Sequence, residues 1–282
     1  GSLAPRNIVA FTFTDKAAQE MIAYMAQKGQ QNAWDRLDAQ LPQCGFGKNG
    51  TCCRICSMGP CRITKKATVG ICGADADTIV ARNYLRIVAA GVSAHSDHGR
   101  TVAEVFLAAA KGEAPDYRIK DMVKLNKLAK EFGVETAGRS VQDIAVDVGE
   151  IALAEFGKPR GTQLMARRAP KPRQELWQKF GVTPRAIDRE IAESMHRSAM
   201  GVDQDYRNVL RQACRVSLAD GWGGAMLATE LQDVLFGVPS PGRGEVNMGV
   251  LKADQVNVIV HGHEPILSEM IAAASQDKEL LA

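Results

Sequence analysis

Residues 44–72 read Cys-Gly-Phe-Gly-Lys-Asn-Gly-Thr-Cys-Cys-Arg-Ile-Cys-Ser-Met-Gly-Pro-Cys-Arg-Ile-Thr-Lys-Lys-Ala-Thr-Val-Gly-Ile-Cys. This stretch, called the cysteine loop below, holds six of the seven cysteines in the chain. They are Cys44, Cys52, Cys53, Cys56, Cys61 and Cys72. Thiols gathered this densely predict a metal or redox centre, and we expect the rest of the chain to be organised around it.

Three chemistries can use such a loop. Disulfides need an oxidising compartment, and the sequence shows no recognisable signal peptide. Zinc takes four ligands, usually as two close pairs, but only Cys53 and Cys56 form a Cys-x-x-Cys pair and no histidine lies near. An iron–sulfur cluster needs four thiolates, which Cys53, Cys56, Cys61 and Cys72 supply at spacings typical of such sites. The pattern favours iron and sulfide, with zinc and disulfides or free thiols as the less favoured alternatives.

Cys44 and Cys52 remain once these four are assigned. Cys52 is adjacent to Cys53, and the side chains of neighbouring residues diverge, so we do not expect both to bind one cluster. A two-fold axis close to Cys44 and Cys52 would bring the same pair from a second copy of the chain and complete a shared cluster. The alternative is an unused pair of thiols.

The motifs in and around the loop resemble a known family. Pro-Gln-Cys-Gly-Phe-Gly (42–47), Cys-Cys-Arg-Ile-Cys (52–56), Gly-Pro-Cys-Arg-Ile (59–63) and Gly-Ile-Cys-Gly-Ala (70–74) are similar to the N-terminal part of the catalytic subunit of anaerobic nickel–iron–sulfur carbon monoxide dehydrogenases. The resemblance continues through residues 79–82, 94–98, 228–230 and 256–268. It implies a [4Fe-4S] relay cluster on the last four cysteines. It also implies a cluster, [4Fe-4S] or [2Fe-2S], that the first two share with a second subunit of a homodimer.

The resemblance further implies an activity, the oxidation of CO with water to CO2, two protons and two electrons. The electrons would pass through the relay and shared clusters to an outside acceptor such as a ferredoxin, and an acetyl-CoA synthase is a further partner that it allows. The nickel–iron–sulfur active-site cluster of the family needs several cysteines, yet only Cys214 follows Cys72. We therefore expect its remaining ligands to lie outside this chain, in a longer subunit. The alternatives are a hybrid-cluster-type reductase and a non-catalytic iron–sulfur electron-transfer module.

Two pairs of histidines are candidate site residues. His95 and His98 are three apart on a predicted helix and share a face, a spacing that suits metal binding, proton relay or plain packing. His261 and His263 follow the apolar run 256–260, at the carboxyl end of a predicted strand where ligands bind in α/β folds. The resemblance implies that His95 is an acid/base beside the active-site cluster, that His98 follows it in a proton path, and that His263 binds the outlying iron.

Asp220 and Cys214 are the other chemically interesting side chains. Asp220 lies in Leu-Ala-Asp-Gly-Trp-Gly-Gly (218–224), before a glycine-rich stretch that we expect to be flexible. It is either an active-site carboxylate or an aspartate at a helix end. Cys214 lies within an apolar helical pattern, and we expect it to be buried. The histidine series departs from the family pattern, because Thr101 and Glu104 occupy the next positions in register.

Apolar periodicity and capping residues predict two domains. Residues 1–237 read as a mainly helical iron–sulfur domain, and residues 238–282 as the beginning of an α/β Rossmann-like domain that is incomplete in this chain. We expect 158–172 to be a surface connection because it is rich in proline and basic residues. The predicted helices include 78–91, 93–110, 121–132, 140–156, 209–219 and 225–236.

Composition excludes some classes of protein. The formal net charge of +3 is too small to argue for nucleic-acid binding, and the basic run 167–173 contains two prolines and no aromatic residue. No apolar run approaches the roughly 20 residues that a membrane span needs. We expect a cytoplasmic protein.

Overall fold

The structure is a computed structural model that describes residues 8–10, 15–238, 258–260, 270 and 274. The chain divides into two compact units. One is the helical unit, Gln43–Val238, and the other combines Gly1–Pro42 with Pro239–Ala282. The predicted division at residues 237 and 238 stays a prediction.

The unit that contains both ends of the chain has two short strands. β1 (Ile8–Ala10) pairs in parallel with β4 (Val258–Val260), so segments far apart in the sequence form one small sheet. β4 lies within the predicted strand 256–260, whereas β1 was not predicted. After β1 come α1 (Asp15–Gln27) and α2 (Ala33–Ala39).

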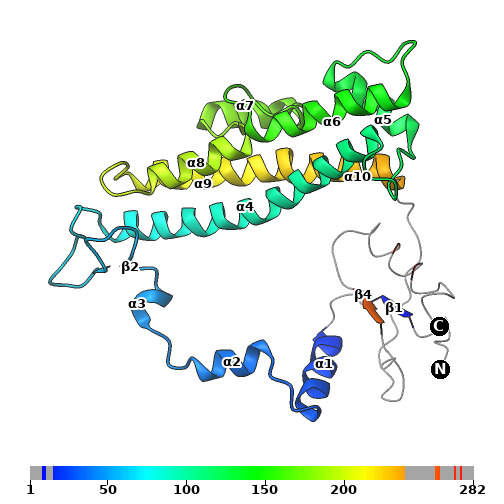
Figure 1. The fold of residues 1–282 in the computed structure, drawn as a ribbon. Coiled ribbons are helices and arrows are strands. Elements are labelled where there is room, and N and C mark those ends of the chain that lie inside the picture. Colours follow the sequence, from blue (N-terminus) through cyan, green and yellow to red (C-terminus); the bar gives the residue numbers. More distant parts are fainter. Residues whose placement is uncertain (1–7, 11–14, 239–257, 261–269, 271–273, 275–282) are drawn as a thin grey trace. The chain divides into compact units, whose positions relative to one another are not determined.

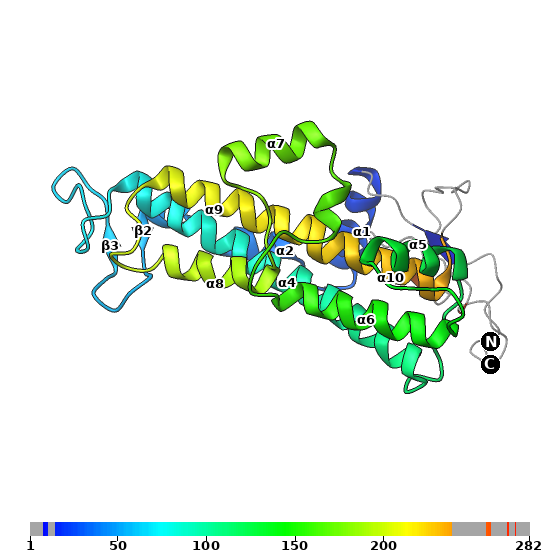
Figure 2. The same ribbon diagram turned by 90° about the horizontal axis from the view of Figure 1, so that it is seen from above.

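The helical unit is built around one long helix, α4 (Ala76–Lys111). Figures 1 and 2 show α4 running the length of this unit, and it contacts α6, α8, α9 and α10 as well as a π-helix, η3. The elements of the unit are α3 (Gly45–Lys48), β2 (Cys52–Cys53), β3 (Cys61–Arg62), α4, α5 (Met122–Phe132), α6 (Val141–Gly157), the 3-10 helix η2 (Met165–Arg168), α7 (Lys171–Phe180), α8 (Ile187–Arg197), α9 (Tyr206–Ala219), η3 (Asp220–Ala225) and α10 (Met226–Phe236).

α4 replaces the two helices predicted for 78–91 and 93–110. Asp75 begins it by accepting a hydrogen bond from the backbone N–H of Thr78, and Gly112 ends it in the left-handed conformation. Gly91 does not interrupt it. A single glycine costs a helix interior only about 1 kcal/mol, and the packing of neighbours such as Val92 outweighs that cost.

The core lies between α4 and the helices around it. Buried positions on α4 recur every three or four residues, the period that places them on one face of a helix. They meet the apolar faces of α6, α8, α9 and α10, and α5 packs in turn against α6 and α10. The fully buried apolar side chains include Leu85, Phe106, Leu125, Leu128, Phe156, Ile187 and Leu231.

The segment after α6 differs from its prediction. Residues 158–172 are not wholly a surface connection, because Met165 and Ala166 in η2 are buried. α7 was not predicted at all. It begins at Lys171 with Pro172 in its first turn, where the missing N–H of proline costs no helical hydrogen bond.

Buried charges join α8 to α9. Glu190 is fully buried and accepts hydrogen bonds from Arg185 and Arg215. Glu193, one turn later, accepts from Arg185, Arg197 and Arg215. Burial alone would raise the pKa of Glu193, but the guanidinium groups of Arg185 and Arg197 outweigh it and lower that pKa to about 2.

Among the residues described, we find no helix with the length and apolar character that a membrane crossing requires.

Candidate metal and acid–base site

The cysteine loop is shaped by two short antiparallel strands. Cys53 on β2 lies opposite Cys61 on β3, and Cys52 lies opposite Arg62. Residues directly opposite across a pair of strands point to the same face, and successive residues on a strand point to opposite faces. The side chains of Cys53 and Cys61 therefore share one face, and that of Cys52 lies on the other.

Two glycines bring further parts of the loop to Cys61. A Cβ added at Gly59 would lie 3.1 Å from Cys53 O and from Cys61 N, and 3.6 Å from Cys56 O. One added at Gly70 would lie 3.5 Å from Cys61 Sγ. The backbone can approach this closely because glycine has no side chain. Segments that carry three of the four predicted relay cysteines thus converge around Gly59, and the segment leading to Cys72 passes Cys61.

Side chains on and after α4 hold the loop in place. Asn83 Nδ2 donates hydrogen bonds to Gly50 O (3.0 Å) and Cys52 O (2.9 Å). Gln204 Nε2 donates to Cys72 O at 3.1 Å, and Thr78 Oγ1 donates to Gln204 O at 2.9 Å. Backbone oxygens from both halves of the loop are therefore tied to the helical core.

The surroundings of two cysteines favour thiolate. Backbone N–H groups of Gly47 and Phe46 lower the pKa of Cys44. At Cys72 burial opposes ionisation, but the N–H of Ala74 and the guanidinium of Arg82 outweigh it and lower the pKa. Thiolate is the form that binds metals.

The donor set fits an iron–sulfur cluster in its chemistry. All six loop cysteines are free thiols. Arg82, which is 1% exposed, directs Nη1 toward Cys72 Sγ at 3.8 Å while its buried Nε has no hydrogen-bond partner. A buried cation beside a cysteine suits an anionic, thiolate-bound group. Across the described ranges, no three His, Cys, Asp or Glu side chains are arranged around one point so as to hold a metal ion.

His95 and Asp220 are brought together from positions 125 residues apart. His95 Nδ1 lies 2.8 Å from Asp220 Oδ2, and Ser96 Oγ donates to Asp220 Oδ1 at 2.6 Å. An ionised carboxylate only accepts hydrogen bonds, so Nδ1 carries the proton in this pair and Nε2 is the nitrogen that can accept one. The side chains of His95 and Asp220 are 41% and 20% exposed.

The π-helix η3 makes this approach possible. A Cβ on Gly224 would lie 2.7 Å from Ser96 Oγ, and a Cβ on Gly99 would lie 3.1 Å from Gly224 O. Gln163 fills the space at Gly223 and donates from Nε2 to Ala219 O at 3.0 Å. The glycine-rich stretch expected to be flexible is therefore a packed π-helix, an element frequent at functional sites.

Sequence reasoning missed Ser96 and Gln163, although Gly-Trp-Gly-Gly between two helical stretches signalled an irregularity. His98 is exposed on α4. Cys214 is exposed on α9, which corrects the expectation that it is buried, because it lies on the polar side of that helix. His263 and its neighbour His261 lie outside the described residues.

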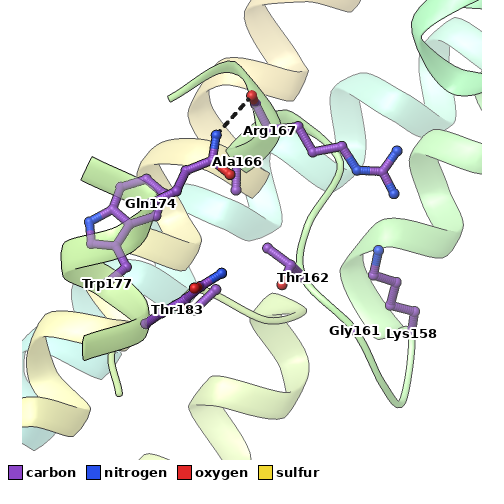
Figure 3. Close-up of a pocket in the computed structure, with 9 residues that line it drawn as sticks. Lys158, Gly161, Thr162, Ala166, Arg167, Gln174, Trp177 and Thr183 are labelled. Carbon is purple, nitrogen blue, oxygen red and sulfur yellow. Dashed lines mark hydrogen bonds between the residues drawn. The ribbon is translucent and has the colours of Figure 1, made fainter. Parts of the chain in front are cut away.

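A separate pocket of about 430 Å³ lies beside α7 (Figure 3). None of its lining residues belongs to the predicted metal or catalytic set. Trp177, at its wall, packs edge-on against Trp222 of η3 with ring centroids 5.6 Å apart. The lining residues are Lys158, Gly161, Thr162, Ala166, Arg167, Gln174, Trp177, Gln178 and Thr183.

The comparison with known families agrees with the resemblance found in the motifs of the cysteine loop. The sequence model of the Prismane/CO dehydrogenase family matches residues 51–282. The chain belongs to this family.

Curated members of the family are similar over almost the whole chain. Carbon monoxide dehydrogenase 1 of Methanosarcina acetivorans is 53% identical over 270 residues, which cover 95% of this chain and 43% of the relative. Carbon monoxide dehydrogenase 2 of Carboxydothermus hydrogenoformans is 46% identical, covering 94% and 42%. This chain therefore spans less than half the length of the curated relatives it matches.

Solved structures share the fold. A nickel-free carbon monoxide dehydrogenase from Thermococcus sp. AM4 superposes with a TM-score of 0.85 at 48% identity, covering 99% of this chain and 44% of that one. An acetyl-CoA synthase/carbon monoxide dehydrogenase, described with NiZn[Fe4S4] and NiNi[Fe4S4] clusters in its alpha subunits, gives 0.82 at 40% identity, covering 97% and 41%.

Proposed function

We propose that this chain is part of a nickel-dependent anaerobic carbon monoxide dehydrogenase, which converts CO and water to CO2, two protons and two electrons. The chain carries the electron-relay clusters and part of the active-site wall. The observation that carries the proposal is the cysteine loop: six free thiols within residues 44–72, tied to α4, in a member of the Prismane/CO dehydrogenase family. The similar proteins named above do not favour a hybrid-cluster reductase.

Cys53, Cys56, Cys61 and Cys72 hold a [4Fe-4S] relay cluster in this proposal. The support for this cluster comes from contacts within the cysteine loop and with Arg82. Cys53 and Cys61 share a face of the β2–β3 pair, and glycines replace the side chains that would keep the loop segments apart. The buried charge of Arg82 beside Cys72 offsets the negative charge of thiolates bound to iron.

Cys44 and Cys52 serve a second, shared cluster, [4Fe-4S] or [2Fe-2S]. Cys52 points away from the face of Cys53 and Cys61, and Cys44 is exposed, so neither is drawn into the relay set. A second copy of the chain would supply the same two thiols across a two-fold axis. The protein is then a homodimer whose shared cluster passes electrons to a ferredoxin-like acceptor.

His95 is the acid/base of the proposed reaction. With Nδ1 held by Asp220, its Nε2 takes up a proton released during CO oxidation, and the exposed His98, one turn on, leads it outward. A nickel–iron–sulfur cluster, when bound, supplies the redox chemistry on the carbon atom. His263 would be one of its ligands in this chain, and the others lie outside this sequence.

The finer architecture is also proposed. Residues 1–237 supply the helical iron–sulfur domain, and 238–282 begin a Rossmann-like α/β domain that β1 (Ile8–Ala10) joins by pairing in parallel with β4. Parallel strands need a crossover connection, and this pairing therefore supports an α/β arrangement. We place the enzyme in the cytoplasm, and the similarity to an acetyl-CoA synthase/carbon monoxide dehydrogenase makes acetyl-CoA synthase a candidate partner.

Iron, sulfide and zinc analysis of the anaerobically purified or reconstituted chain tests the proposal. Three clusters per two chains are expected, two relay clusters and one shared. The double variant Cys44→Ser/Cys52→Ser should lose one cluster per two chains, and Cys214→Ser should lose none. Zinc without sulfide would overturn the proposal. Loss of two clusters per two chains in the double variant would refute the sharing.

A further inference from the structure

Arg82 on α4 is a fully buried charge without a carboxylate partner among the described residues. Its side chain is 1% exposed and is one of the largest that are completely buried. A guanidinium stays protonated in proteins, and a buried charge is costly unless it is paired. The carboxylate of Asp203, whose backbone lies beside it, is paired with Arg197 instead.

The polar contacts of Arg82 lead to the cysteine loop. Nη2 donates to Asp203 O at 2.5 Å, Nη1 points to Cys72 Sγ at 3.8 Å, and Nε is buried without a partner. A backbone carbonyl is neutral. Within the described part of the chain, the sulfur of Cys72 is thus the group in contact with Arg82 that can carry a negative charge.

The position of Arg82 is rigid. It lies near the N-terminus of the 36-residue helix α4, between the buried residues Ile79 and Leu85. The next residue, Asn83, holds the other side of the loop through Gly50 O and Cys52 O. A charge fixed in this way cannot turn out to solvent, and water is excluded from around it. Its field is therefore screened much less than that of an exposed arginine.

We propose that Arg82 is a positioning residue that sets the reduction potential of the cluster at Cys53, Cys56, Cys61 and Cys72, an inference that rests on the proposed function. Reduction adds one electron to the cluster and makes it more negative by one charge. The fixed positive charge stabilises the reduced form more than the oxidised form, so it raises the potential. Arg82 remains protonated throughout, and no proton is transferred.

The test is a redox titration of the anaerobically reconstituted full chain with dithionite, followed by electron paramagnetic resonance. Arg82→Gln keeps a hydrogen-bond donor and removes the charge. It should lower the equilibrium constant for reduction at least tenfold, which is about 59 mV for a one-electron couple. Arg82→Lys keeps the charge and should recover most of that shift. Arg86→Gln is the matched control, since Arg86 lies one turn along α4 and bonds to Ser198 Oγ; its shift should be smaller.

The outcomes separate this inference from the proposed function. A wild-type chain that binds no iron and sulfide refutes the proposed function before any variant is made. Arg82→Gln with full iron content and the wild-type potential refutes the role of Arg82 and leaves the proposed function standing. If Arg82→Gln folds but does not load iron, the iron content and the reduction potential of Arg82→Lys decide whether the charge has the proposed role. Restored loading near the wild-type potential supports the inference, and failure of both variants to load refutes a role of the charge.

Discussion

Replacing Gly224 with alanine should force η3 away from α4 and separate Asp220 from Ser96. The new Cβ would lie 2.7 Å from Ser96 Oγ and 3.0 Å from Asp220 Oδ1, whereas ordinary contact begins at 3.4 Å. Overpacking of this kind costs about 1–3 kcal/mol. The displacement that relieves it breaks the 2.6 Å hydrogen bond from Ser96 to the carboxylate, and bonds to charged groups contribute about 1.5–3 kcal/mol.

These two costs overlap, because the same movement relieves the clash and breaks the bond, so we expect a loss of about 2–3 kcal/mol. Alanine regains about 1 kcal/mol over glycine in a helix interior. The net change in the free energy of unfolding of Gly224→Ala is therefore a loss of about 1–2 kcal/mol. Urea denaturation followed by far-ultraviolet circular dichroism measures it.

Gly221→Ala is the matched control in the same π-helix. A Cβ at Gly221 meets nothing within 4 Å, and its φ lies outside the left-handed region. This variant should keep or slightly raise the stability, so the two alanine variants should differ by about 2–3 kcal/mol. If Gly224→Ala and Gly221→Ala unfold at the same urea concentration with the same slope, the close packing of η3 on α4 and the reasoning built on it are wrong.

Two further predictions concern the helical unit. Leu128→Ala, at a fully buried position on α5, should lower the free energy of unfolding by about 2–5 kcal/mol. Val123→Ala, 82% exposed on the same helix, should change it by less than about 0.5 kcal/mol, and equal effects would contradict the assigned core. The pKa of Glu193 is lowered from 4.5 to about 2, so its contribution of about 3 kcal/mol is complete above pH 4.5 and is lost as the pH falls toward 2. In Glu193→Gln the free energy of unfolding should fall less between pH 5 and pH 2 than in the wild type. The control Glu175→Gln changes an exposed glutamate and should fall as much as the wild type. If Glu193→Gln falls as much as Glu175→Gln does, this role of Glu193 is disproved.

Local signals in the sequence predicted many of the helices. Asp121 and Gly133 bracket α5 as the capping rules require, and Ser140 begins α6. The failures also have physical reasons. Gly91 looked like a break, but its neighbours on α4 are packed against other helices. α7 was missed because it begins inside the basic run 167–173, which contains two prolines, and within the helix only Trp177 is buried.

The candidate site also has parts that the sequence could predict and parts that it could not. The cysteines of the loop could be recognised from their spacing, since a cluster on one short segment needs ligands that are close in sequence. The contact between His95 and Asp220 could not, and neither could the approach of Arg82 to Cys72. The sequence allowed Asp220 to be either an active-site carboxylate or an aspartate at a helix end, and the structure shows it hydrogen-bonded to His95 and Ser96.

The order of the residues by itself determined the family, the cysteine loop, the N-caps of α5 and α6, and the helical character of α4, α5, α6, α9 and α10. All of these depend on residues that are near one another along the chain. Tertiary structure alone decided that η3 is a π-helix, that β1 pairs with β4, and which polar side chains meet. The pairing of β1 with β4 and the contact of His95 with Asp220 join segments more than a hundred residues apart, and the packing of helices and strands against one another selects these partners, which no local pattern records.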